Sequence, residues 1–559
     1  MQLSLPELKE TLKELLERSV ASVCSTESSQ ELFLEVPKNR QHGDFTTHVA
    51  MRLASKNRRD PLALAGDIVA FLNTLLTEKK LSGVFQKIEV LSPGFINFFL
   101  TETQHRHILS VIVSNPSYGA SPLGKGTRLQ IEFVSANPTG PLSVAHGRQA
   151  AVGDALARIL EFCGYEVSRE YYVNNVGNQI RLLGLSLFLR YRELFGEKIE
   201  IPEGGYRGAY LIDLAKEIQD REGERYRKES EEALPYFERY ACERILEIIR
   251  QDLSRFGVRF DHFTFESDLR SQGKVEEAFD ILRKKEVLFE SEGATWFRST
   301  AFGDDKDRVV VKSDGSFTYL APDIAYHREK FRAGFNRLID IWGPDHHGYI
   351  ARMRAAVSAL GHEAEALSIL IIQLATLYRD GKAVPMSTRL GEFVTLREVT
   401  EEVGVDAARY FFLMKKLASH LDFDLALAKK QSLENPVYTI QYAHARIANI
   451  LAFGKETVGE ITPEEISSEL LKTDEELELL KELALFPDVV VSCAKSLEPA
   501  PLALYLQKLA GAFHAFYQKD RVVTDDLALS RARTLLILCI QQVLAQGLSL
   551  LGVSTPDRM

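Results

Sequence analysis

The spacing of hydrophobic residues changes along the chain and divides it into three parts. Residues 1–112 mix helical and strand-like spacing. Leucines from Leu5 to Leu15 recur on one helical face, while the apolar runs 31–36 and 87–100 have the character of strands, the second broken by a Pro-Gly turn. This part is therefore predicted to form a small α+β domain.

Residues 113–402 follow an alternating pattern of strands and helices. The apolar stretch 128–136 runs into a loop rich in Gly and Pro (137–147), then into a helical stretch (148–164) and a second strand (165–173). A strand, loop, helix and strand in this order form a βαβ unit. The pattern predicts an α/β domain with a doubly wound parallel sheet.

The same part contains an interruption before its strands resume. The charged, helical stretch of about 178–285 is predicted to be an insertion in the α/β domain. Residues 308–312 and 317–321 flank a Ser-Asp-Gly-Ser turn and are predicted to form a hairpin. Residues 337–348 are predicted to be a strand that runs into a loop, with a helix over 349–361.

Residues 403–559 are predicted to be almost entirely helical. Four long segments carry apolar stripes at helical spacing, including one over 532–551. Stripes of this kind must pack against one another to be buried. The third part is therefore predicted to be a helix bundle.

Composition narrows the class of protein. The 559 residues include 68 Lys and Arg and 78 Asp and Glu, a net charge of −10, which argues against a protein that coats nucleic acid by bulk charge. Local basic faces can still bind phosphates. No apolar run approaches the ~20 residues of a membrane span, and the N-terminus does not resemble a signal peptide. We expect a soluble, cytoplasmic protein without a membrane partner.

The cysteines indicate the same compartment. Five are scattered without a CxxC pair: Cys24, Cys163, Cys242, Cys493 and Cys539. Histidines do not cluster at ligand spacing, so no structural metal site is expected. The pattern favours buried or inert thiols in a reducing cytosol.

The loop that follows the first strand of the βαβ unit is the first candidate for chemistry. It lies where open α/β sheets bind nucleotides and where a helix N-terminus can receive phosphate. Gly140 and Gly147 would let the backbone approach a ligand, and His146 can donate a hydrogen bond to a phosphate oxygen. The alternative is a histidine that only caps the helix, and the spacing alone favours neither.

A second candidate loop lies in residues 381–399. Met386, Ser387 and Arg389 follow Lys382 in a basic stretch flanked by glycines. Such a loop can move over a triphosphate and stabilise charge as pyrophosphate leaves. Considered alone, the loop is better explained as ordinary surface.

Together the two loops resemble the paired signatures of class I aminoacyl-tRNA synthetases. The surrounding sequence is similar to one family of that class, the arginyl-tRNA synthetases, in stretches such as EFVSANPTGPLSVAHGRQAAVGDALARIL, YYVNNVGNQI, SFTYLAPDIAYHREK and VDAARYFFLM. Similar stretches run in the family's order from about residue 33 to the last residue.

The resemblance implies a Rossmann-type catalytic domain over 113–402. Using ATP, accompanied by Mg²⁺ but without a protein metal site, it would join L-arginine to AMP with release of pyrophosphate and then pass arginine to the 3′ end of tRNA(Arg). The domain over 1–112 would grip the tRNA elbow, and the bundle over 403–559 would bind the anticodon. We expect a monomer that needs tRNA for activation. A synthetase for another amino acid is disfavoured, and a tRNA-binding paralogue that has lost activation is the alternative.

Site residues are also implied by the resemblance. Those for ATP are Gly140, His146, Gly147, Gly343, Asp345 and Met386. Those for arginine are Glu132, Ser135, Asn137, Tyr319, Asp323 and His346. A guanidinium favours carboxylates in fork geometry and a flat aromatic contact, which Glu132, Asp323 and Tyr319 can supply. Without the resemblance, Tyr319 would be a half-buried strand aromatic and Asp323 a carboxylate at a helix start.

The signatures depart from the family's pattern at several positions. Ser143 replaces the first histidine of the first signature, and Ala145 its glycine. The second signature lacks both lysines. The catalytic candidates are therefore His146, Ser143, Ser387, Arg389 and Lys382, of which Lys382 and Arg389 are the local candidates for neutralising pyrophosphate.

Two sets of residues are candidates for tRNA binding. Lys38, Arg40 and His42 lie in an exposed loop of the first domain, where a solvated loop is an equal alternative. Tyr438, Gln441, Tyr442 and Arg446 recur at helical spacing in the bundle and would stack on and read bases. The alternative for the second set is that the tyrosines pack the bundle core.

Overall fold

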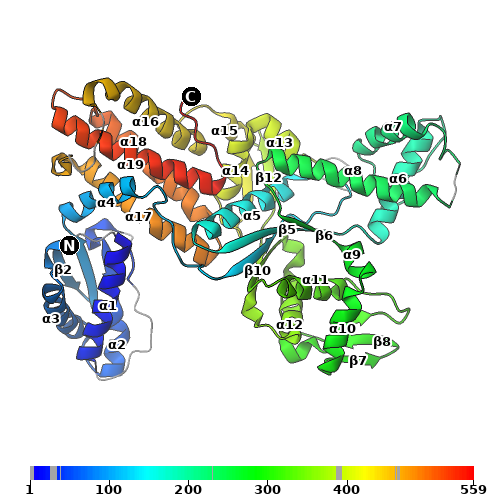
Figure 1. The fold of residues 1–559 in the computed structure, drawn as a ribbon, viewed down its shortest axis with the longest axis horizontal. Helices are drawn as coiled ribbons and strands as arrows, with labels where there is room; N and C mark the ends of the chain where they lie inside the picture. The colour runs from blue at the N-terminus through cyan, green and yellow to red at the C-terminus, as the bar shows by residue number, and fades with distance from the viewer. Residues whose placement is uncertain are drawn as a thin grey trace.

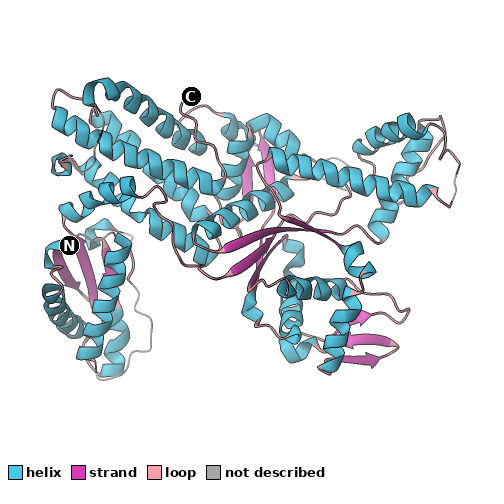
Figure 2. Ribbon diagram, viewed as in Figure 1, coloured by secondary structure: helices cyan, strands magenta, loops and turns pink. Residues whose placement is uncertain are grey.

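The computed structural model describes residues 5–24, 34–37, 39–228, 231–384, 393–459, 461 and 466–559, without the side chains of Pro6, Arg40 and Glu456. A central sheet lies between the helical bundle on one side and an extended helical arm on the other, and the N-terminal domain packs below the bundle (Figure 1). Figure 2 shows strands in the N-terminal domain, the central sheet and its small satellite sheets, while the bundle is helical.

The N-terminal domain has the predicted α+β character. Its elements are α1 (Leu5–Val23), β1 (Phe45–Thr47), α2 (Val49–Asn57), α3 (Pro61–Glu78), β2 (Phe85–Leu91) and β3 (Phe95–Leu100). The strands form an antiparallel sheet in the order β1-β3-β2, and the predicted Pro-Gly turn joins β2 to β3. The strand expected over 31–36 is reduced to one bridge between Glu35 and Thr46 in the part that is described.

A doubly wound sheet forms the centre of the molecule. Its strands are β4 (Arg128–Glu132), β5 (Glu166–Val173), β6 (His262–Phe265), β10 (Arg337–Trp342) and β11 (Leu367–Ile371), all parallel, in the order β11-β10-β4-β5-β6. Helix α5 (Val144–Phe162) follows β4 and approaches the end of that strand closely: a Cβ on Gly153 would lie 2.1 Å from the ring of Phe133. The strand order reverses between β4 and β10, which is where open α/β sheets form a ligand-binding crevice at the carboxyl ends of their strands.

The predicted insertion is helical over only part of its length. It consists of α6 (Asn178–Glu193), α7 (Tyr210–Glu222) and α8 (Ala233–Arg255), which form the arm in Figure 1. The chain then returns through β6, which pairs with β5, and continues into α9 (Glu266–Ser271) and α10 (Lys274–Lys284). A four-residue strand among charged helices has too short a pattern to be distinguished by spacing.

The predicted hairpin is wrong in its second strand. β9 (Arg308–Val311) pairs instead with β8 (Ala294–Phe297), which pairs with β7 (Leu288–Ser291). Beyond the turn, only Phe317 forms a bridge to Val311, and α11 (Leu320–Arg332) begins at once. Pro322 lies in the first turn of α11, where a missing N–H costs nothing, and it favours the helix over a strand.

The predicted bundle is present and is preceded by a small sheet that was not predicted. That sheet contains β12 (Ala375–Arg379), β13 (Lys382–Ala383) and β14 (Leu421–Asp424). The helices of this half are α12 (Ile350–Leu360), α13 (Leu396–Val403), α14 (Val405–Leu413), α15 (Leu425–Lys429), α16 (Pro436–Val458), α17 (Asp474–Ser496), α18 (Ala500–Lys519) and α19 (Leu527–Leu551). Helix α4 (Glu102–Ser114) leaves the N-terminal domain and packs on α17 and α19.

Within the described residues, two helices are long and apolar enough to cross a membrane by length and composition, so the expectation that no such stretch exists was too strict. They are α3 and α19. In α19, 67% of the most apolar window is buried inside the bundle. Its hydrophobicity is accounted for by its place in the core. The five cysteines are all free and buried, as predicted.

Candidate active site

The crevice between β4 and β10 begins with a strained turn. Val134 and Ser135 follow β4 with φ angles of 68° and 36°, a left-handed conformation that residues with a Cβ rarely adopt. Two contacts from β5 hold the turn: the hydroxyl of Tyr171 donates to the Ala136 carbonyl (2.8 Å), and the Tyr172 N–H donates to Ser135 Oγ (3.0 Å). Strain of this kind persists only where surrounding structure enforces it. The contacts from β5 therefore hold the turn in its strained conformation.

Glu132, the last residue of β4, is buried and already has two partners. Its Oε2 lies 2.6 Å from Nζ of Lys330, and its Oε1 accepts a hydrogen bond from Ser135 Oγ (2.9 Å). Lys330 also contacts Asp340 Oδ1 at 3.0 Å, and Asp340 is the register partner of Glu132 on β10. Two predicted arginine-binding residues, Glu132 and Ser135, therefore lie together at the crevice.

Asp323 lies on α11 beside the crevice and forms no ion pair with a described side chain. Its Oδ2 accepts a hydrogen bond of 2.7 Å from the hydroxyl of Tyr349. Burial raises the pKa of Asp323 to about 6, and the nearby carboxylates Glu132 and Glu266 act in the same direction, against the Tyr349 bond and His327. This carboxylate lacks the cation that would stabilise it.

Tyr319 is the N-cap residue of α11, and its side chain is 76% exposed. The expectation that it is a half-buried strand aromatic is thus wrong. Residues four apart on a helix share a face, so Tyr319 lies one turn before Asp323 on the same side of α11. The pair has the spacing to meet one ligand, although the tyrosine ring does not pack into the crevice here.

His146 is set at the start of α5 by Ser143, the N-cap residue. The Ser143 N–H and Oγ both lie 3.2 Å from His146 Nδ1. Burial lowers the pKa of His146 to about 4, so the ring is neutral at pH 7. Because Nδ1 accepts from a backbone N–H, the single proton belongs on Nε2, which can donate to an anion. The capping role and a phosphate-binding role are therefore compatible.

The two glycines of this loop have different surroundings. A Cβ on Gly147 would lie 2.6 Å from Leu396 of α13 and 3.3 Å from Phe412 of α14, so this glycine allows helix packing. A Cβ on Gly140 would lie 3.2 Å from the hydroxyl of Tyr210. The close approach at Gly147 is to two helices, and its predicted contact with ATP stays a prediction.

The remaining described candidates of the catalytic domain lie on several elements. Gly343, Asp345 and His346 follow β10, and the last two are exposed in the short helix η4 (Pro344–Tyr349). Asn137 is exposed and donates to Gln179 Oε1 (2.7 Å). Lys382 is exposed on β13.

Some predicted residues lie outside the part of the chain that the structure describes. These are Met386, Ser387, Arg389 and Lys38, together with the side chain of Arg40. His42 is described and is exposed in the short helix η1 (Arg40–His42) of the N-terminal domain. Among the described residues, no group of three or more His, Cys, Asp and Glu side chains is arranged to hold a metal ion.

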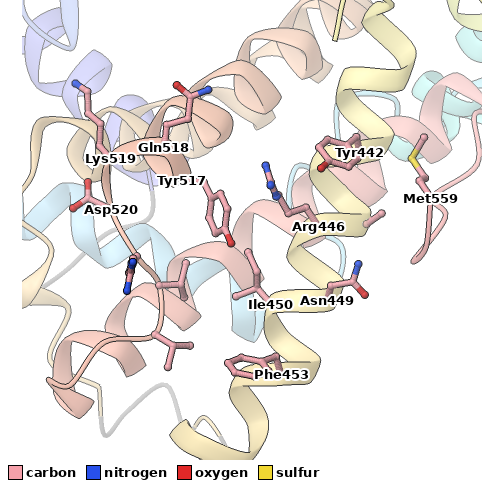
Figure 3. A pocket seen from close by; sticks show the side chains of 14 residues that line it. Tyr442, Arg446, Asn449, Ile450, Phe453, Tyr517, Gln518, Lys519, Asp520 and Met559 are labelled. Carbon is pink, nitrogen blue, oxygen red and sulfur yellow. The ribbon is translucent and has the colours of Figure 1, made fainter. Parts of the chain in front are cut away.

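A second site lies in the bundle, in a cavity of about 640 Å³ between α16 and the end of α18 (Figure 3). Arg446 reaches across it, with its guanidinium carbon 5.2 Å from the ring centre of Tyr442 and 4.5 Å from that of Tyr517. Phe453, on the same helix, is 74% exposed, and the C-terminal residue Met559 closes one side.

The four predicted bundle residues divide between this cavity and the interior. Tyr442 and Arg446 line the cavity, and Tyr438 stacks on Tyr442 at a centroid distance of 5.7 Å. Gln441 is buried and donates to Asp406 Oδ2 (2.8 Å) and the Ser554 carbonyl (3.0 Å), so its amide serves the bundle. No sequence pattern pointed to Tyr517 or Met559, because only the folded bundle brings them to α16.

Three family models match most of the chain. Residues 7–100 match the arginyl tRNA synthetase N terminal domain, residues 107–421 the catalytic domain of tRNA synthetases class I (R), and residues 440–559 the DALR anticodon binding domain.

Curated relatives and a solved structure agree with these models. The arginine–tRNA ligase of Geobacter sp. (strain M21) is 49% identical over 529 residues, 94% of either chain. That of Bacillus cereus (strain ATCC 10987 / NRS 248) is 44% identical over 561 residues, 100% of both chains. The Thermus thermophilus arginyl-tRNA synthetase superposes with a TM-score of 0.77 at 22% identity, covering 99% of this chain and 100% of that one, which supports the fold.

Proposed function

The chain belongs to the arginyl-tRNA synthetase family, and we propose that it activates arginine in the crevice between β4 and β10. As a member of that family it joins arginine to tRNA and uses ATP to do so. No observation favours the alternative of a tRNA-binding paralogue without activation.

The observation that carries the proposed site is the carboxylate of Asp323, which has no ion-pair partner among the described side chains. A half-buried carboxylate without a cation is unfavourable in the free protein, and a guanidinium that forms a bidentate pair with it removes that penalty. We place the arginine guanidinium against Asp323, with Tyr319 covering its flat face from one turn before. Ser135 and Asn137, on the turn after β4, are assigned to the α-amino and carboxylate end, and His346 at the mouth completes the set.

The triphosphate of ATP is assigned to the start of α5. The helix N-terminus presents unpaired N–H groups, and the neutral His146 ring directs Nε2–H outward to donate to a phosphate oxygen. Gly343 and Asp345 after β10 are assigned to the adenosine. Catalysis would be positioning plus charge stabilisation, as the arginine carboxylate attacks the α-phosphorus and pyrophosphate leaves in line.

Charge on the departing pyrophosphate needs cations other than Lys330, which is already paired with Glu132 and Asp340. Mg²⁺ bound to ATP would supply part of it. Lys382 at the start of the second signature, and Arg389 within it, are assigned the rest, with Ser387 and Met386 in the same segment.

The bundle cavity is assigned to bases of the tRNA. Base stacking on aromatic side chains contributes about 1–3 kcal/mol per base, and Arg446 between two tyrosine rings offers both a flat surface and a positive charge. Lys38, Arg40 and His42 of the N-terminal domain are kept as candidates for phosphate contacts at the elbow. We propose a soluble, cytoplasmic monomer as the working form.

Arginine-dependent exchange of pyrophosphate into ATP, with and without tRNA(Arg), tests the site. The variant Asp323→Ala should raise the KM for arginine about 100-fold or more while leaving the KM for ATP within about twofold, as expected for a charged hydrogen-bonded pair. Equal effects on the two constants would contradict the assignment of Asp323. Exchange that appears only with tRNA would support a pocket completed by the tRNA.

A further inference from the structure

A single buried lysine joins the two central strands beneath the proposed arginine site. The side chain of Lys330, on the last turns of α11, is 2% exposed and lies between Glu132 of β4 and Asp340 of β10. Its ammonium also lies 4.2 Å from the ring centre of Tyr326. Lysine is almost never buried to this degree unless it is paired. The burial of Lys330 therefore depends on its two carboxylate partners.

The lysine belongs to a continuous series of polar contacts that crosses the crevice floor. Ser135 donates to Glu132 (2.9 Å), Glu132 contacts Lys330 (2.6 Å), and Lys330 contacts Asp340 (3.0 Å). His327 Nε2 then lies 2.8 Å from Asp340 Oδ2, while its Nδ1 donates to the backbone carbonyl of Asp323 (2.8 Å). The series therefore begins at the strained turn after β4 and ends at the residue assigned to the guanidinium.

The neighbouring carboxylates keep Lys330 charged, and Lys330 in turn keeps them ionised. Burial alone would lower the pKa of Lys330, but Asp340, Glu132 and Glu170 more than offset burial and raise it, so the ammonium keeps its proton. The pKa of Asp340 is held well below its usual range, because Lys330 and His327 outweigh its burial. Without the ammonium, Glu132 and Asp340, which are register partners on adjacent strands, would face each other as like charges.

The same geometry separates the carboxylates of the crevice into two kinds. Glu132 and Asp340 share Lys330. Glu170 accepts from Gln130 and Tyr326 (3.2 Å each), and Glu266 accepts from Arg270 (2.9 Å). Neither Glu170 nor Asp323 forms an ion pair with a described side chain. They differ in exposure: Glu170 is 1% exposed, whereas Asp323, whose carboxylate accepts from the hydroxyl of Tyr349, is half-buried.

We propose that Lys330 is a positioning residue for arginine: by holding Glu132 and Asp340 it fixes α11 against the sheet and so sets the place of Asp323 relative to Glu132. Lys330 does not touch the substrate in this arrangement. It acts through Glu132 on one side and through Asp340 and His327 on the other.

The test is a double-mutant cycle on arginine affinity. Lys330→Met and Glu132→Gln should each raise the KM for arginine at least about tenfold, the usual size for truncating one partner of a buried pair, with the KM for ATP and the Kd for tRNA within about twofold. The double variant should be no worse than the poorer single variant, because each change breaks the same contact. Multiplication of the two effects, or equal changes in the ATP constant, would overturn the proposal.

Two further variants keep the test decisive. Arg332→Met removes an exposed cation from the same helix and should leave both constants unchanged. If Lys330→Met does not fold, His327→Gln, which breaks the series between Asp340 and Asp323, should raise the KM for arginine about threefold to tenfold. An unchanged constant there would contradict the proposal.

Because the proposal rests on the arginine site assigned above, Asp323→Ala is measured alongside. A large effect of Asp323→Ala with no effect of Lys330→Met and His327→Gln would reject the positioning role and leave the site intact. No effect of Asp323→Ala would reject the site itself.

Discussion

Arginine affinity should fall as pH is lowered through about 6, because the carboxyl of Asp323 must be ionised to pair with a guanidinium. Burial holds the pKa of Asp323 at about 6 in the free protein, against its ordinary 3.8. That difference corresponds to ~3 kcal/mol against the ionised form. A bound guanidinium offsets this cost and lowers the pKa again, so arginine binding and deprotonation are coupled.

The magnitude follows from the fraction of protein that carries the ionised carboxylate. At pH 7.5 nearly all molecules do, whereas at pH 5 roughly one in ten does, so the Kd for arginine should rise about tenfold between these values. The guanidinium keeps its charge throughout this window. The same carboxyl has the opposite effect on the stability of the fold. Because its pKa is raised in the folded protein, the protonated carboxyl stabilises the fold at low pH, and that contribution is lost as pH rises through 6.

Isothermal titration calorimetry with arginine, in the presence of tRNA and at intervals from pH 5 to pH 7.5, measures the effect directly. Asp323→Asn is the matched control, since it keeps the shape of the side chain and should bind weakly at every pH without a transition. A Kd for the unaltered protein that stays constant over this range would refute the reasoning. A transition that persists in Asp323→Asn would assign the titration to another group.

Three further outcomes are expected. His146→Ala should slow adenylate formation about 100-fold, the size expected for one preorganised donor, and a single-turnover rate close to that of the unaltered protein would exclude His146 from the site. Gly147→Ala should lower the thermal unfolding midpoint through ~1–3 kcal/mol of overpacking against Leu396 while the KM for ATP changes little; a selective rise in that KM would restore the ligand-contact interpretation. Arg446→Met and Tyr517→Ala should each weaken tRNA binding about tenfold in filter-binding assays, with Arg531→Met, outside the cavity, as a control that leaves binding unchanged.

The βαβ unit was predictable because its signals are local. The strand that ends at Glu132, the Gly/Pro loop and helix α5 lie within about 35 residues, and parallel topology then places the crevice at the end of β4. The same logic pointed to His146 as a candidate, whereas Ser135 was implied only by the family resemblance. The logic failed for the hairpin, where Pro322 and the helical preference of the following residues outweighed a good turn.

The contacts that define the arginine site were not predictable, because they join distant residues. Lys330 meets Glu132 across 198 positions of sequence, and Arg446 meets Tyr517 only when α16 packs beside α18. In sequence, Lys330 is one of several charged residues on an amphipathic helix, and the usual position of such a lysine is the surface. Only the register of β4 with β10 brings Glu132 and Asp340 together, so that Lys330 can contact both.

The distribution of charge in the crevice also bears on the missing signature lysines. Glu132, Asp340 and Asp323 make the floor acidic, which suits a cationic amino acid but opposes a triphosphate. On the ATP side, the start of α5 offers only the partial charge of a helix terminus and a neutral imidazole. We therefore expect positive charge for pyrophosphate from the Mg²⁺ that accompanies ATP and from Lys382 and Arg389 of the second signature.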